Sequence, residues 1–368
     1  MNVRNSITSS SRIKWIDLLK CLTIWLVVLG HAPNCQTDMK QLIYSFHMPV
    51  FFAIYGLTYN MEQHDKRGWL TFHFVKQKLR RLMLPALIWA LLYSIFSNFS
   101  FSAKNVLFVF FGSHASLKAA SSLTSIWFLP CMFITVCFAE VIISWLYQIF
   151  KGKGNHKYIL LALAVIMILF AFLAGQIPRL SHGWPWCINI VPMSVSYVFM
   201  GVILHEFNTK YPKACDNHWL LLLVFFISLI LTIFVCKLNL RFISINNADM
   251  ASANYGNVFL YLINSALGLL MMMSLSKLME ILIKQTALLT LLTYIGTQSL
   301  AIFLLHKPMI RYSCSSAKYH GFGEWYIPIV LSVVVTLLCA LLAYFINRYL
   351  PWAIGSQKSK KLAQAEKG

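Results

Sequence analysis

The sequence has little acidic charge: 11 Asp and Glu stand among 368 residues, against 31 Lys and Arg. Charged residues make up 11% of the chain and hydrophobic residues 59%, and the mean hydropathy is +0.67. This composition excludes an ordinary soluble domain. The chain also lacks a CxxC pair, so its nine cysteines are expected to be small apolar packing residues, and no metal site is expected.

Three further features are missing. No internal repeat is visible, which disfavours transporters built from inverted halves. No cleavable signal peptide is evident, because the first apolar run carries Asp17 and Lys20 and no small-residue cleavage site follows it. No stretch between the apolar runs is long enough for a soluble domain, so any catalysis is expected within or at the edges of a helix bundle.

Apolar runs of about 17 to 25 residues, the length of a helix that crosses a bilayer, recur along the chain. Hydropathy predicts an all-α, polytopic integral membrane protein with about ten transmembrane helices. A membrane domain is expected over residues 1–350, with a basic cytoplasmic tail over residues 351–368. The expected spans are residues 13–32, 41–60, 82–100, 126–149, 158–176, 188–206, 218–237, 257–276, 289–310 and 326–350.

The basic residues follow this expected topology. Most of them fall in the segments that share a side of the membrane with the two termini. The positive-inside rule therefore predicts that both termini are cytoplasmic. Because the basic residues are dispersed among the membrane loops, membrane lipids are expected partners and nucleic acid is not.

Three ionisable residues share the first expected span: Asp17, Lys20 and His31. Ionisable groups inside a bilayer cost several kcal/mol and usually mark a pathway or a reaction site. Lys20 and His31 are eleven residues apart, so they lie on one face of a helix and about 16 Å apart along its axis. Asp17, three residues before Lys20, is on a neighbouring strip. This span is therefore the first candidate site.

Two more histidines are expected at the depth of His31. His47 stands near the start of the second span, in SFHMPVFFAIYG, and His306 near the end of the ninth, in YIGTQSLAIFLLHKPMI. One histidine at a helix end is most simply an interfacial residue, but three from separate helices at one leaflet predict a site. Gln298 and Ser299, one or two turns from His306, are expected to form hydrogen bonds in the same cavity.

Two other features have a structural and a functional interpretation. The loop after the second span, KQKLRRLMLP, carries Lys78, Arg80 and Arg81. These residues are either an anchor on lipid headgroups or a grip on the phosphates of a nucleotide. Glu140, in the fourth span, is either paired with a nearby hydroxyl or exposed to a watery cavity inside the bundle.

At these motifs the chain resembles the membrane-bound acyltransferase 3 family, whose members acylate sugars of surface polysaccharides, glycolipids and related molecules. The resemblance spans nearly the whole chain. It implies a bacterial inner-membrane enzyme of ten helices that takes an acyl group, usually acetyl, from cytoplasmic acyl-coenzyme A and delivers it towards the outer face. Its motifs, in order, are WIDLLKCLTIWLVVLGH, SFHMPVFFAIYG, KLRRLMLP, SIWFLPCMF, PMSVSYVFMGVILHE and IGTQSLAIFLLHKP.

The resemblance also implies residue roles. His31 corresponds to the essential histidine, Lys20 to a basic position of the first helix, and Lys78 and Arg81 to paired basic positions after the second. Lysine stands at two places where the family more often has arginine, and Tyr55 stands where it often has serine. The chain lacks the soluble esterase-like domain of some members, which implies direct transfer or a separate partner in polysaccharide biosynthesis.

The predicted function is acyl transfer, most simply of acetyl, from acetyl-coenzyme A to a hydroxyl of an exported or lipid-linked sugar. His31 is expected to act as a general base or as a covalent carrier of the acyl group. The alternatives are a succinyl or longer-acyl transferase, and a non-catalytic transporter or flippase of glycolipids or small anions. The expected site residues are His31, Lys20 and Asp17 for catalysis, Lys78, Arg80 and Arg81 for the donor, and His47, His306, Glu140, Gln298 and Ser299 for the acceptor.

Overall fold

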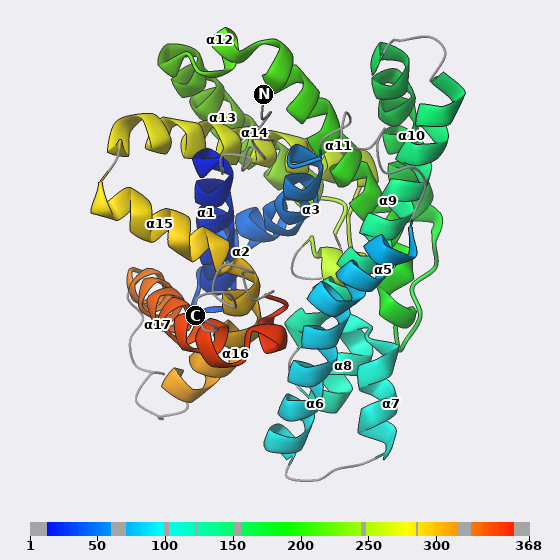
Figure 1. Cartoon of the computed structure of the whole chain (residues 1–368), viewed down its shortest axis with the longest axis vertical. Coiled ribbons are helices and arrows are strands. Elements are labelled where there is room, and N and C mark those ends of the chain that lie inside the picture. The colour runs from blue at the N-terminus through cyan, green and yellow to red at the C-terminus, as the bar shows by residue number, and fades with distance from the viewer. Residues whose placement is uncertain are drawn as a thin grey trace, which may run out of the picture.

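The computed structural model describes residues 13–59, 71–98, 103–121, 124–150, 156–243, 248–284, 286–314 and 325–356. Within these ranges the regular secondary structure is helical; the helices are joined by loops, and one isolated β-bridge links Asp249 and Asn254. Figure 1 shows α1 (Lys14–His31) inside the molecule, with helices from the C-terminal half of the chain around it.

Six of the described helices are long and apolar enough to cross a membrane. They are Thr124–Phe150, Lys157–Gln176, Pro185–Lys210, His218–Leu240, Val258–Ile283 and Ile327–Tyr349. A seventh candidate consists of α15 (Ala287–Thr297) and α16 (Ser299–Cys314), which are bent by 79° where they meet. The chain is therefore an all-helical, multi-pass membrane protein.

The sequence predicted about ten spans, and three of these are not long apolar helices in the structure. The first is α1, whose 18 residues include the charged Lys14, Asp17 and Lys20. The second is divided between two short helices, and the third is a helix of 15 residues. These are α2 (Thr37–Tyr44), α3 (His47–Leu57) and α6 (Leu84–Asn98).

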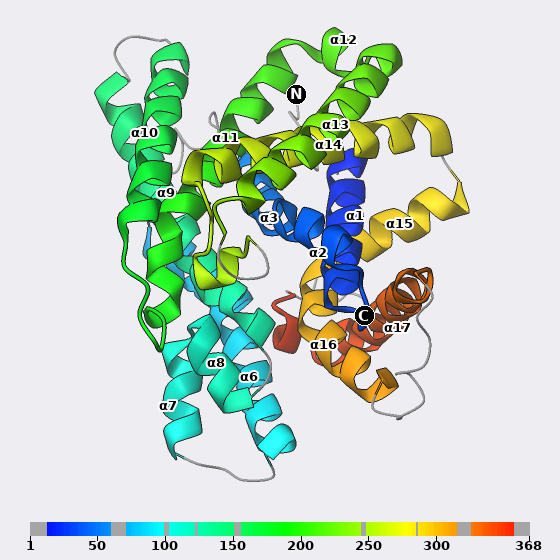
Figure 2. The same ribbon diagram turned by 180° about the vertical axis from the view of Figure 1, so that it is seen from behind.

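The other described helices complete the bundle. Figure 2 shows α6, α7 and α8 together at one end of the molecule, below α9 and α10. The bounds are α5 (Phe72–Lys78), α7 (Ala103–Phe111), α8 (His114–Ser121), α9 (Phe128–Phe150), α10 (His156–Gln176), α11 (Val191–Lys210), α12 (Pro212–Cys215), α13 (His218–Leu240), α14 (Val258–Ile283) and α17 (Ile327–Tyr349), with the short 3-10 turns η2 (Thr124–Trp127), η4 (Pro185–Ile190) and η5 (Met250–Ser252).

Two glycines let α3 and α11 cross with their backbones in contact. A Cβ on Gly56 would lie 2.0 Å from the carbonyl oxygen of Val198, and a Cβ on Gly201 would lie 2.1 Å from that of Ala53. A backbone cannot move aside as a flexible side chain does, so only glycine fits at either position. The crossing fixes α3, which begins at His47.

Two contacts hold the first turns of α1. A Cβ on Gly296 of α15 would lie 1.8 Å from the carbonyl oxygen of Asp17, so these two helices also touch at their backbones. Lys277 of α14 is buried, its ammonium lies 2.9 Å from Oδ1 of Asp216, and it covers the ring of Trp15 at 5.2 Å. Together these contacts set the position of α1, and hence of His31 at its end.

A π-helical turn, η1 (Leu79–Met83), leads into α6, and the last described residues of the chain pack against it. The 3-10 turn η7 (Pro351–Ile354) packs beside it, and a Cβ on Gly355 would lie 2.2 Å from the carbonyl oxygen of Arg81. The packed body thus continues into the segment that the sequence predicted to be a tail. Residues 357–368 of that tail lie outside the described residues.

Candidate functional site

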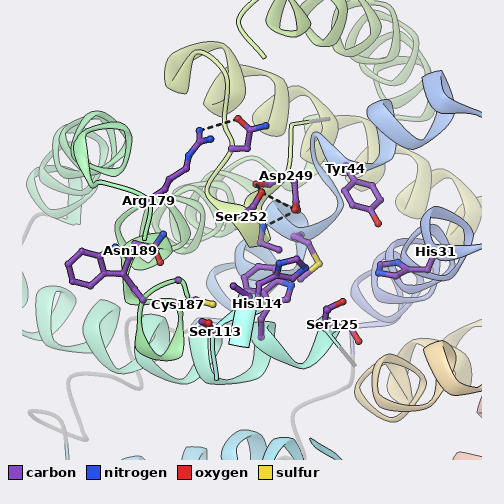
Figure 3. A pocket seen from close by; sticks show the side chains of 18 of the residues that line it. His31, Tyr44, Ser113, His114, Ser125, Arg179, Cys187, Asn189, Asp249 and Ser252 are labelled. Carbon is purple, nitrogen blue, oxygen red and sulfur yellow. Dashed lines mark hydrogen bonds between the residues drawn. The ribbon is translucent and has the colours of Figure 1, made fainter. Parts of the chain in front are cut away.

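A cavity of about 620 Å³ lies at the His31 end of α1. We call it the His31 cavity. Its walls come from α1, α2, α3, α8, η2, η4, α16 and the loops before η4 and α14. Figure 3 shows His31 and Ser125 at one end of the cavity, Arg179 at the other, and Asp249 between them.

Three histidines near this cavity make the same backbone contact, and it fixes where their protons lie. Nδ1 of His31 is 2.9 Å from the carbonyl oxygen of Val27, and Nδ1 of His47 is 2.7 Å from that of the residue four positions earlier. Nδ1 of His306 is 2.8 Å from the carbonyl oxygen of Phe303. Because a carbonyl can only accept, each neutral ring carries its proton on Nδ1, which leaves a lone pair on Nε2.

The ring of His31 is packed between two others. It meets His306 edge to face, with ring centroids 5.1 Å apart, and stacks on Tyr44 at 6.0 Å. Tyr44 lies in turn 5.0 Å from the ring of His47. The structure therefore brings together the three histidines that the sequence singled out. His31 and His47 line the cavity, whereas His306 is buried behind His31.

An imidazole in this arrangement has two uses. The Nε2 lone pair of His31 can remove a proton from a hydroxyl, or it can attack a carbonyl carbon. The Val27 carbonyl takes the place at Nδ1 that a carboxylate holds in many catalytic dyads, so it orients the ring without adding a charge.

The cavity also contains polar residues that the sequence analysis did not single out. Ser125 is buried, and its hydroxyl has no hydrogen-bond partner among the described residues. Lys307 donates a hydrogen bond to the hydroxyl of Thr124. Lys307 directly follows His306, so its place in the motif was a usable signal, whereas Arg179 lies in a loop without a recognisable pattern.

A second cavity, of about 250 Å³, contains the basic residues of the sequence analysis. We call it the Lys20 cavity. Lys20, Lys78 and Arg81 line it together with Tyr55. The ammonium of Lys20 lies 3.2 Å from Oδ1 of the buried Asp17, and that of Lys78 lies 4.6 Å from the centre of the Tyr55 ring.

The other residues expected at the site are divided. Ser299 lines the Lys20 cavity, whereas Arg80 is exposed and lines neither cavity, because successive residues of a helix point about 100° apart. Gln298 lies where α15 meets α16 and accepts a hydrogen bond from Asn347 at 2.5 Å. Glu140 is buried in α9 and lines neither cavity.

Aromatic rings separate the two cavities. Phe303 lines both of them and packs against Phe128, with ring centroids 5.3 Å apart. Phe128 lines the Lys20 cavity, and the adjoining Trp127 lines the His31 cavity. Both phenylalanines are buried. We call Phe128 and Phe303 the aromatic wall.

One protein-family model matches most of the chain. The model of the acyltransferase 3 family, described as an acyltransferase domain, matches residues 13–347. The matched range contains every residue that lines the His31 and Lys20 cavities. No curated protein matches the chain.

Proposed function

Because the chain belongs to the acyltransferase 3 family, we propose that it transfers acetyl from cytoplasmic acetyl-coenzyme A to a hydroxyl of an exported or lipid-linked sugar. The enzyme would act in the bacterial inner membrane. The observation that carries the proposal is the environment of His31: its Nδ1 proton is committed to the Val27 carbonyl, and its ring lines a large cavity that also contains several charged and hydroxyl side chains. A base or a nucleophile placed in this way suits acyl transfer to a hydroxyl.

The Lys20 cavity supports the donor half of the proposal. Lys20, Lys78 and Arg81 offer ammonium and guanidinium donors to phosphate oxygens. At about 250 Å³ the cavity is smaller than the roughly 300–1,000 Å³ of a pocket for a drug-sized ligand. It would therefore take only part of the donor, with the nucleotide outside it at the cytoplasmic surface. The pairing of Lys20 with Asp17 offsets one of these charges before the donor binds.

The thioester has to pass the aromatic wall to reach His31. Phe303 is the residue common to both cavities, and its side chain turns about two torsions. We infer that rotation of Phe303 away from Phe128 joins the cavities when the donor is bound. A wall that closes afterwards keeps water away from the reacting thioester.

In the general-base route, Nε2 of His31 takes the proton of the acceptor hydroxyl while the hydroxyl oxygen attacks the thioester carbonyl carbon. The carbon–sulfur bond then breaks, and the imidazolium returns the proton to the departing thiolate. Ser125 and Lys307 line the same cavity and would donate hydrogen bonds to the oxyanion. In the covalent route, the same lone pair attacks the thioester carbonyl carbon, the carbon–sulfur bond breaks, and coenzyme A leaves as the thiolate, which takes up the Nδ1 proton of the acylated ring. The sugar hydroxyl then attacks the acyl-imidazole, and its proton passes to the ring as the carbon–nitrogen bond breaks; trapping the acyl-imidazole for mass spectrometry would detect this route.

The test is His31→Ala in membranes supplied with labelled acetyl-coenzyme A and a glycan acceptor. We expect transfer to fall by at least about 100-fold, because a positioned general base contributes 10²–10⁴ in rate. His218→Ala is the matched control, since His218 is exposed and lines neither cavity. Unchanged transfer in membranes that hold normal amounts of the His31 variant would remove His31 from the mechanism.

A further inference from the structure

The His31 cavity has an excess of positive charge. Its lining includes three cations, Lys40, Arg179 and Lys307, and one carboxylate, Asp249. Charges of one sign in a cavity with low-dielectric walls focus their field on whatever enters it. The excess therefore bears on the ligand only if the cations are not already neutralised by the protein.

The carboxylate of Asp249 accepts hydrogen bonds from its own turn rather than pairing with the three cations. Its Oδ1 accepts a hydrogen bond from the backbone N–H of Ala251 at 3.0 Å, and its Oδ2 accepts one from the hydroxyl of Ser252 at 3.1 Å. Its backbone pairs with Asn254 in the isolated bridge. The carboxylate thus caps its own turn, and among the described residues no ion pair joins it to Lys40, Arg179 or Lys307.

Each cation instead has a neutral partner. Lys307 donates to the Thr124 hydroxyl, and Lys40 lies over the ring of Tyr44 at 5.6 Å. Nη2 of Arg179 donates to Oδ1 of Asn254 at 3.1 Å. These neutral partners do not offset the charges, and Asp249 acts on Lys307 only through space, so an anion in the cavity would meet a net excess of positive charge.

Arg179 is the cation best placed to bind such an anion directly. Its guanidinium carries five N–H donors in a planar fork that matches a carboxylate or a phosphate. Figure 3 shows its side chain at the far end of the cavity from His31, tied to the turn that contains Asp249. A sugar whose hydroxyl meets His31 would therefore extend towards Arg179.

We propose that the acceptor carries an anionic group, a carboxylate or a phosphate ester, and that Arg179 binds this group. The inference rests on the proposed acyl transfer to a sugar and names the chemical class of that sugar. Arg179 acts as a specificity residue, since it binds a group of the acceptor that is remote from the reacting hydroxyl.

Binding to the full-length purified protein tests the proposal without catalysis. The probes are methyl glucoside, methyl glucuronide and methyl glucoside 6-phosphate, titrated calorimetrically. We expect one anionic sugar to bind at least about tenfold more tightly than the neutral one, and which one it is identifies the group. Arg179→Gln should reduce the preference to about twofold or less, and Arg179→Lys should keep part of it.

Arg241→Gln is the matched control, because Arg241 is an exposed arginine that lines neither cavity. It should keep the full preference. Equal binding of neutral and anionic sugars, or a preference that survives Arg179→Gln, would overturn the inference.

The His31→Ala variant separates this inference from the proposed function. It should keep the binding preference and lose transfer. If His31-dependent transfer occurs equally to all three sugars, the inference of an anionic acceptor is wrong and the proposed function stands. If the preference depends on Arg179 but no transfer depends on His31, the binding site stands and the proposed function fails.

Discussion

The ring of His306 meets the ring of His31 edge to face, with their centroids 5.1 Å apart. His306 is fully buried, and its Nε2 has no hydrogen-bond partner among the described residues. A buried acceptor left unsatisfied costs about 1–3 kcal/mol. Such a cost is typical of a position that serves the chemistry of a site rather than the stability of the fold.

We therefore expect His306→Phe to raise the melting temperature and to lower the rate of acyl transfer by about tenfold. The phenyl ring keeps the packing against His31 but removes the unsatisfied nitrogen. Thermal unfolding in detergent and kcat on the same preparation measure both effects. A variant that is less stable but transfers acetyl at the normal rate would show that His306 is only a packing residue.

The aromatic wall predicts that a smaller side chain at Phe303 lets water hydrolyse the thioester without transfer. Phe303→Leu replaces the ring with a smaller side chain and so opens the wall between the two cavities to water. Hydrolysis of the thioester, measured as coenzyme A released without acceptor, should rise by roughly two- to tenfold relative to transfer. Phe303→Trp should slow transfer, because the larger ring obstructs the passage. Thiol release with and without acceptor gives the ratio.

Phe52→Leu is the control for the lost packing. Phe52 is fully buried and lies 5.0 Å from the Phe128 ring, but it lines neither cavity. Its substitution should leave the ratio of release to transfer unchanged. A leak of equal size in both variants would argue against a gating role for Phe303.

The basic turn η1 offers a comparison between adjacent arginines. Arg81→Gln and Lys78→Gln should each raise the KM for acetyl-coenzyme A by about tenfold with little change in kcat, because each removes a donor to phosphate. Arg80→Gln should change neither value, since Arg80 is exposed outside the Lys20 cavity. Equal effects at all three positions would contradict specific phosphate contacts and indicate that the positive charge of this segment attracts lipid headgroups or the nucleotide only in a general way.

The crossing of α3 and α11 predicts strong effects of single methyl groups. Gly56→Ala and Gly201→Ala should each leave little folded protein in the membrane, because the added carbon overlaps a carbonyl oxygen of the other helix. Gly175→Ala is the milder comparison, since its Cβ would lie 2.7 Å from a side-chain carbon of Val258. Detergent-resistant folded protein, measured by gel filtration, distinguishes the three.

Part of the site was accessible from the sequence. Spacing along one helix placed Lys20 and His31 on one face, and the level of three separate histidines indicated that His31, His47 and His306 meet. The structure brings the three histidines together, because depth along a helix is a local property, whereas it places Lys20 and His31 in different cavities. The number of spans was less accessible, since hydropathy does not register the break before His47 or the 79° bend between α15 and α16.

The composition and the ordered motifs determined by themselves that this is a helical membrane protein of the acyltransferase 3 family. Only the tertiary structure decided that Arg81 lines a cavity while Arg80 does not, that Phe303 stands between two cavities, and that Arg179 faces the same space as His31. The physical reason is that these relationships depend on how helices distant in sequence are rotated and packed. No local pattern of residues encodes that rotation.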